Sequence, residues 1–83
     1  MSRSIQVELA AIQDLSAHHV HAGGWVATGA VADVVGAEVE ETAARLRGAS
    51  KRGLCLSRRS LLYGTTWKLT RAGVESLLVE SGT

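Results

Sequence analysis

The hydrophobic period of this chain changes at Gly53, and that change most constrains its fold. Ahead of Gly53, apolar residues recur at the spacing of one helical face. After it, residues 54–57 and 66–69 alternate apolar and polar side chains, which is typical of strands with one buried face. The sequence therefore predicts an α+β fold that is mostly helical, with one small β-hairpin.

A first helix is predicted to run from a Ser4 cap to about His19. Gly23 and Gly24 break the helical pattern, and the short apolar stretch 25–27 that follows predicts a brief strand. The inward face of this helix is expected to consist of four aliphatic residues: Ile5, Leu9, Ile12 and Leu15.

A second helix is predicted from a Thr28 cap to Gly36, and a third from Glu38 towards Ser50. Apolar or small side chains form their inward faces: Val31, Ala32 and Val35, then Val39, Thr42, Leu46 and Ala49. The opposite side of the third helix is left free, with Glu40, Ala44, Arg47 and Lys51.

Two strands then form a hairpin with its turn around 62–64, and a last helix follows a Thr70 cap. Val74, Leu77 and Leu78 form the apolar side of that helix. A register with Ser60 opposite Thr65 fixes the other strand positions: Leu56 faces Leu69, Arg58 faces Trp67, and Arg59 and Lys68 project from the other side. A slip of one residue would reverse these faces.

The length of 83 residues suits one domain over 1–83, near the lower limit at which a core is stable without disulfides or metal. One cysteine excludes an intrachain disulfide, and no signal peptide or membrane-spanning stretch is recognisable, which predicts a cytoplasmic protein. A homodimer would add buried surface to a core built from modest side chains.

The net charge of +1 conceals a strong asymmetry along the chain. Eight of the nine basic residues fall between Thr42 and Val74, where no acidic residue occurs, so this segment carries +8. The remainder carries −7, because Arg3 stands against eight acidic residues. Such a cationic segment favours a polyanionic partner, and double-stranded DNA is the commonest one.

Two sequence features resemble a known family. The stretch VATGAVADVVGAEVEETAARLRGASKRGL, followed by a hairpin and WKLTRAGVESLL, is similar to the winged helix-turn-helix domains of prokaryotic regulators, including the MarR type. The first feature is a small helix ending at Gly36, then a second helix with spaced aliphatics, then Gly53 and Leu54. The second is an aromatic, one residue, Leu-Thr, two residues and Gly: Trp67, Leu69, Thr70 and Gly73.

The resemblance implies that the third helix, about 38–51, lies in the major groove and that the wing, about 54–70, contacts the backbone or minor groove. Carried over by position, the groove-facing residues are Glu40, Ala43, Ala44, Arg47 and Lys51, while Arg58, Arg59 and Lys68 on the wing would neutralise phosphates. The function expected is sequence-specific DNA binding by a small transcriptional regulator, repressor-like, or a phage-type accessory factor, acting as a homodimer.

An alternative follows from Glu38, Glu40 and Glu41 in the first turn of the third helix, since carboxylates repel phosphates unless one of them accepts from a cytosine amino group. The alternative is a winged domain for protein recognition, an adaptor or an inhibitor of a nucleic-acid enzyme, with this acidic first turn and the turn at 61–63 as its contacts. Residues 61–63 at the hairpin turn are unusually apolar; packing onto the sheet is favoured over contact with a partner or insertion into a groove.

The remaining reactive side chains do not predict a catalytic or metal site. His18, His19 and His21 suit a helix C-terminus better than a metal, because neighbours on a helix point about 100 degrees apart. Cys55 is expected to be a half-buried filler. Trp25 and Trp67 are expected to pack together. No nucleophile with a base, phosphate loop or cofactor motif is apparent, so neither an enzyme nor a cofactor is expected.

Overall fold

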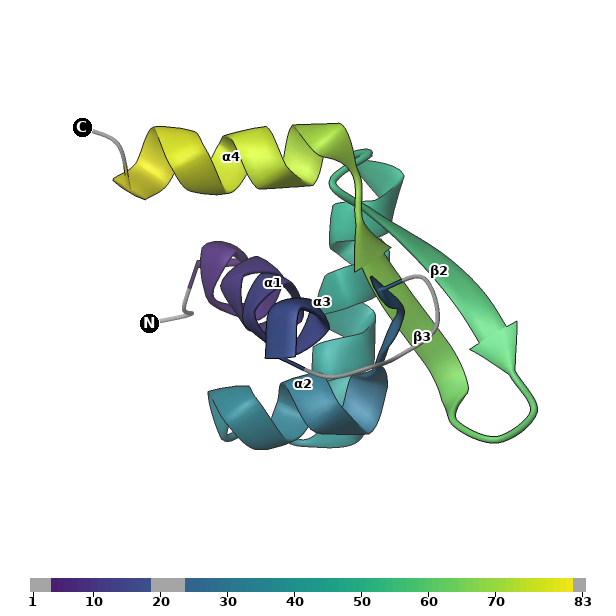
Figure 1. The fold of residues 1–83 in the computed structure, drawn as a ribbon. Helices are drawn as coiled ribbons and strands as arrows, with labels where there is room; N and C mark the ends of the chain where they lie inside the picture. The colour runs from purple at the N-terminus through teal and green to yellow at the C-terminus, as the bar shows by residue number, and fades with distance from the viewer. Residues whose placement is uncertain (1–3, 19–23, 82–83) are drawn as a thin grey trace.

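The computed structural model describes residues 4–18 and 24–81 (Figure 1). This part of the chain contains four helices and one three-stranded antiparallel sheet, which confirms the predicted α+β class and the predicted order of elements. The elements are α1 (Gln6–His18), β1 (Val26–Ala27), α2 (Thr28–Val35), α3 (Val39–Lys51), β2 (Cys55–Ser60), β3 (Gly64–Leu69) and α4 (Arg71–Ser81).

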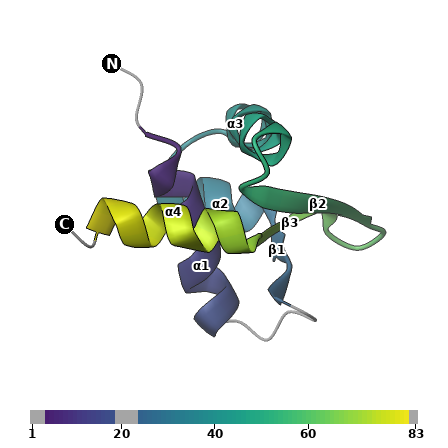
Figure 2. The same cartoon turned by 90° about the horizontal axis from the view of Figure 1, so that it is seen from above.

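The helices form a body from which the β2–β3 hairpin projects. In Figure 2, α4 crosses α1, α3 lies at the opposite edge, and the hairpin extends to one side. β3 is the central strand, with β1 and β2 as its neighbours, so the hairpin is joined to the body through β3 and the short β1. The outer half of the hairpin has no helix against it (Figure 1).

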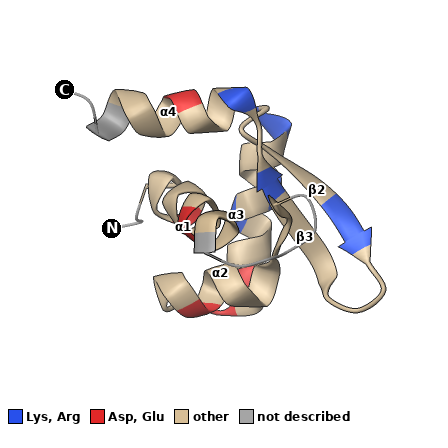
Figure 3. Ribbon diagram, viewed as in Figure 1, with Lys and Arg blue, Asp and Glu red and all other residues tan. Residues whose placement is uncertain are grey.

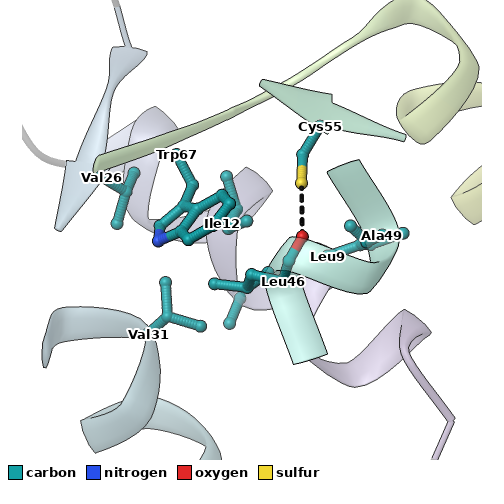
Figure 4. Close-up of a cluster of buried hydrophobic side chains, with 9 residues drawn as sticks. Leu9, Ile12, Val26, Val31, Leu46, Ala49, Cys55 and Trp67 are labelled. Carbon is teal, nitrogen blue, oxygen red and sulfur yellow. Dashed lines mark hydrogen bonds between the residues drawn. The ribbon is translucent and has the colours of Figure 1, made fainter. Parts of the chain in front are cut away.

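Trp67 lies at the centre of the core, where aliphatic side chains from α1, β1, α2 and α3 surround its ring (Figure 4). The fully buried members are Leu9, Ile12, Val26, Val31, Leu46, Cys55 and Trp67. The predicted inward faces of α1 and α2 are thus confirmed, as are Thr42, Leu46 and Ala49 on α3. Val39 was wrongly assigned to the core: it is exposed, because the body covers α3 only from Thr42 onward.

The hydroxyl of Thr28 bonds to the core and does not cap α2, contrary to the prediction. The Trp67 indole Nε1 donates to Thr28 Oγ1 at 2.7 Å, and that hydroxyl donates to the carbonyl of Thr65 at 2.8 Å. The N-cap is Ala27, without a side-chain hydrogen bond. A buried indole N–H needs an acceptor, and this requirement outweighs the gain from a cap.

The hairpin register differs by one residue from the prediction. Ser60 pairs with Gly64, so Cys55 pairs with Leu69 and Ser57 with Trp67. Gly64 adopts a φ of 71°, which closes a loop of three residues, and Ser60 Oγ accepts from the backbone N–H of two of them.

This slip exchanges the two faces of β2. Cys55 is buried and Leu56 is exposed, the reverse of the expectation. Arg58 now shares a face with Lys68, while Arg59 lies on the other face of the strand.

The pattern Trp67, Leu69, Thr70 and Gly73 has a separate physical cause at each position. Trp67 fills the core and Leu69 packs against it. Thr70 caps α4 as predicted, since its Oγ1 accepts from Gly73 N–H at 3.1 Å. A Cβ on Gly73 would lie 2.0 Å from the carbonyl oxygen of Leu54, so only glycine lets α4 approach the start of the hairpin this closely.

The end of α4 is less covered than predicted. Leu77 packs against the core, but Leu78 and Val79 are exposed. α4 continues past the end of α1 in Figures 1 and 2, which removes these side chains from the body.

Candidate nucleic-acid interface

Six of the eight cations between Thr42 and Val74 are exposed and pair with no carboxylate of the described residues. Two of them lie on α3, one follows it, and three lie on the hairpin: Arg47, Lys51, Arg52, Arg58, Arg59 and Lys68. Figure 3 shows basic segments on α3, along the hairpin and at the start of α4, whereas acidic segments lie in α1, in α2, at the start of α3 and in α4. The charge asymmetry of the sequence is therefore also an asymmetry in space.

The charge on the exposed side of α3 changes from negative to positive along the helix. Glu40, Ala44, Arg47 and Lys51 are all exposed, as predicted, whereas Ala43 is partly buried. Glu40 and Lys51 are separated by roughly 16 Å along the helix axis at about 1.5 Å per residue. The positive residues, Arg47 and Lys51, lie in the second half of the helix, which leads into the hairpin.

Arg45 does not belong to the cationic surface, although the sequence places it among the eight cations. Its Nε donates to Glu8 Oε2 at 2.6 Å and its Nη2 donates to Glu8 Oε1 at 3.2 Å. The Glu8 side chain is 0% exposed and that of Arg45 is 22% exposed. The hydrogen bond to Glu8 raises the pKa of the Arg45 guanidinium. Paired in this way, Arg45 links α1 to α3 and adds little to the surface charge.

Sequence reasoning missed Glu8, although its position gave an indication. Glu8 falls three residues after Ile5 and four before Ile12, on the apolar stripe of α1. A carboxylate at such a position requires a partner of opposite charge. That partner lies 37 residues away, and nothing local identifies it.

Arg58 is held on the outer face of the sheet by an aromatic ring. Its guanidinium carbon lies 4.5 Å from the centroid of the Trp25 ring, a cation–π arrangement. The backbone below is fixed as well, because Thr66 Oγ1 donates to the carbonyl of Arg58 at 2.8 Å. Trp25 and Trp67 therefore do not pack together as predicted: Trp67 is in the core, and Trp25 lies under Arg58 on the other face.

The hairpin tip, defined as Leu61, Leu62 and Tyr63, does not pack onto the sheet. Its side chains are 104%, 84% and 59% exposed, respectively. The favoured prediction was wrong for Leu61 and Leu62, because the three-residue loop leaves both side chains in solvent. Contact with a partner and insertion into a groove remain as the alternatives.

Cys55 is more buried than the expected half-buried filler. Its Sγ lies 3.5 Å from the carbonyl oxygen of Leu46, to which the thiol donates, and burial raises its pKa to about 11 (Figure 4). The thiol is therefore a neutral part of the core at physiological pH.

Of the three histidines, only His18 falls within the described ranges, as the last residue of α1; His19 and His21 lie outside them. Within those ranges no three side chains of the metal-binding types come together.

No helix in the part of the chain that the structure describes has the length and apolar character needed to span a bilayer. No family model and no curated protein sequence matches this chain.

Proposed function

We propose that this chain is a winged helix-turn-helix domain that binds double-stranded DNA sequence-specifically, with α3 in the major groove and the β2–β3 hairpin as the wing. The observation that carries the proposal is the run of six exposed cations, from the second half of α3 through the hairpin, that pair with no carboxylate of the described residues. Its biological role would be that of a small transcriptional regulator, repressor-like, or a phage-type accessory factor.

The side chains of α3 fit a groove-bound helix. Ala43 and Ala44 are small, so the helix axis can approach the base edges closely. Arg47 lies one turn further on and is exposed, where a guanidinium can donate two hydrogen bonds to a guanine edge. Lys51, at the end of the helix, is placed to meet a phosphate.

The two ends of α3 contribute unequally in this proposal. Glu40 lies near the helix N-terminus, where it suits the helix dipole but repels phosphate unless it accepts from a cytosine amino group. The later turns of α3 and the wing therefore carry most of the affinity. The wing contributes Arg58, Arg59 and Lys68, and Trp25 holds the first of these in place.

A titration of a labelled random-sequence duplex at low and at physiological salt tests the proposal. Each phosphate that a cation neutralises contributes about −0.9 to the log–log dependence of affinity on salt, so several contacts give a steep loss. Selection of bound sequences from the same pool then shows whether one sequence is preferred. Undetectable duplex binding at low salt, where electrostatic attraction is strongest, would overturn the proposal.

Single variants separate base contacts from phosphate contacts. Arg47→Ala is expected to relax the selected sequence preference, whereas Arg59→Ala and Lys68→Ala weaken binding to all sequences alike and reduce the salt slope by about 0.9 each. Arg71→Ala is the matched control, since this exposed arginine already pairs with Glu75 at 3.3 Å. An equal loss of affinity for all four variants would argue against the assigned contacts.

We include a homodimer in the proposal on the basis of α4. Leu78 and Val79, near the end of this helix, are 62% and 73% exposed, and a second copy would cover them. A two-fold dimer requires two half-sites about one helical turn apart, roughly 34–36 Å. Sedimentation equilibrium of the wild type and of Leu78→Ser tests this. If both are monomers at all concentrations, the dimer is not part of the function.

A second candidate, a winged module for protein recognition, is favoured by a different surface. Glu38, Glu40 and Glu41 are exposed beside two exposed valines, Val34 and Val39. A Glu40→Lys, Glu41→Lys double variant distinguishes the candidates. If the start of α3 lies near phosphates, duplex affinity rises; if this surface serves a protein partner, duplex affinity stays unchanged.

A further inference from the structure

The hairpin tip is the most exposed apolar segment among the described residues, and two arginines, Arg58 and Arg59, precede it on β2. We propose that Leu61 and Leu62 form a wedge that enters the minor groove and unstacks a base step, so that binding bends the duplex. The inference rests on the proposed DNA-binding function and adds an activity to it, the deformation of DNA.

The tip presents its leucines without using them for stability. Leu61 is 104% and Leu62 84% exposed, so neither stabilises the hairpin by burial. The Ser60 side chain holds the loop instead: its Oγ accepts from Leu62 N–H at 3.2 Å and from Tyr63 N–H at 3.3 Å. A pair of leucines held outward in this way is available to enter an apolar space in a partner.

The charges around the tip indicate what kind of partner offers that space. Arg58 and Arg59 lie on β2 just before the tip, Lys68 lies on β3 nearer the base of the hairpin, and the hairpin contains no acidic residue. The minor groove combines phosphates on both rims with an apolar base stack at its floor, and proteins insert leucine between base steps there. The hairpin therefore matches both parts of that surface.

The reach of the hairpin favours DNA over an anionic bilayer. Six-residue strands carry the tip roughly 20 Å from the base of the hairpin at about 3.3–3.4 Å per residue. With α3 in the major groove, the adjacent minor groove lies about half a helical turn away, roughly 17 Å. The cations extend back along this length to Lys51 rather than surrounding the tip alone.

Insertion should change the shape of the DNA more than it changes affinity. Unstacking a base step costs free energy, and burial of the leucines together with closer phosphate contacts offsets that cost. Bending is therefore the property that depends on the tip. Apolar wedges of this kind kink duplexes by roughly 20–90°.

The test measures energy transfer between dyes at the two ends of a duplex of about two helical turns. A 2-aminopurine at a central TA step, which is easily unstacked, reports base opening in the same complex. The full-length wild-type chain is expected to raise both signals. A Leu61→Ala, Leu62→Ala double variant is expected to lose both while binding within about fivefold of the wild type, since phosphate contacts dominate affinity.

Leu56→Ala is the matched control, because this leucine is exposed on the same hairpin but near its base. It should leave the bend unchanged. Thermal unfolding midpoints should be equal for the wild type and the double variant, because the leucines are exposed; this shows that any loss of bending is not a loss of folding.

The outcomes separate the inference from the function it rests on. Duplex binding without bending, or bending that persists in the double variant, overturns the wedge alone and leaves DNA binding standing. Absence of duplex binding overturns both. Tip-dependent sedimentation with phosphatidylserine–phosphatidylcholine vesicles, together with an unbent duplex, assigns the leucines to a membrane and overturns the wedge.

Discussion

The body and the hairpin of this molecule use their side chains for different purposes. In the body, most buried polar side chains bond to partners within the chain, as Glu8 does to Arg45 and Trp67 to Thr28, although Thr42 Oγ1 has no hydrogen-bond partner among the described residues. In the outer hairpin, residues 56–64 are mostly exposed, and their cations bond to no described carboxylate. The body therefore determines stability, whereas the hairpin leaves its charges and apolar tip available to a partner.

The comparison implies that residues of the same type should have different effects on stability according to whether they are packed or open to solvent. Tryptophan, glutamate and glycine each occur both in a packed and in an open environment. The first three predictions compare such pairs, and a pair with equal effects would break the distinction.

The largest difference is expected between the two tryptophans. Trp67→Ala should lower the free energy of unfolding by about 4 kcal/mol, because it removes the centre of the core. Trp25→Ala should lower it by about 1 kcal/mol or less, since Trp25 mainly holds Arg58. Urea unfolding followed by circular dichroism measures both. If Trp25→Ala proves as costly as Trp67→Ala, the outer face of the sheet is part of the core after all.

The next difference is between two glutamates in ion pairs. Glu8→Ala should lower the free energy of unfolding by about 3 kcal/mol, because it leaves a largely buried guanidinium without its partner. Glu75→Ala removes an exposed pair with Arg71, which is worth about 0.5 kcal/mol or less.

A Glu8→Met, Arg45→Met double variant should recover most of the loss, since apolar residues of similar volume avoid the cost of burying charge. Equal losses from the single and the double variant would mean that Glu8 contributes through packing rather than through its charge. The same urea titration measures all three variants.

Substitution of two helical glycines by alanine should change the free energy of unfolding in opposite directions. Gly73→Ala forces the backbone of α4 away from Leu54 and should cost about 2 kcal/mol or more. Gly48→Ala, in the middle of α3, meets nothing within 4 Å and should raise stability by about 0.5–1 kcal/mol through helix propensity. A stabilising Gly73→Ala would show that the junction between α4 and the hairpin can open.

The smallest effect on stability is expected from Cys55→Ser, and it should depend on pH only in the alkaline range. Burial raises its pKa from 9.0 to about 11, so the neutral thiol stabilises the fold fully below pH 9, and this contribution is lost as pH rises towards 11. The stability difference between wild type and Cys55→Ser should shrink on the order of 1 kcal/mol across that window. A constant difference would mean that the thiol ionises without opening the core.

Much of the fold could be predicted because its causes are local in sequence. Helical spacing identified Leu9, Ile12 and Leu46 as core residues, and Thr70 was correctly assigned as a cap, since each depends on near neighbours. The register could not be fixed in this way. It depends on the backbone angle of Gly64, and a difference of one residue in loop length exchanged the roles of Cys55 and Leu56.

The candidate site was predicted less fully because several of its features depend on contacts far apart in the chain. The sequence identified the exposed residues of α3 and the cations of the hairpin. It did not reveal that Arg45 is paired or that Arg58 lies over Trp25, contacts that span 37 and 33 positions. The exposure of Leu61 was missed because apolar residues are normally buried, and a loop that points them outward leaves no mark in hydrophobic periodicity.

Thr70 closes the hairpin at its base: its hydroxyl donates to the carbonyl of Gly53 at 2.6 Å, and its N–H donates to that of Leu54 at 3.2 Å. Both ends of the hairpin are thus joined to each other before either reaches a helix. The turn beyond the pair Arg59 and Thr65 consequently forms a replaceable module. Evolution or a protein engineer can lengthen, shorten or exchange that module without rebuilding the domain, which makes the turn a natural place for one scaffold to acquire new targets.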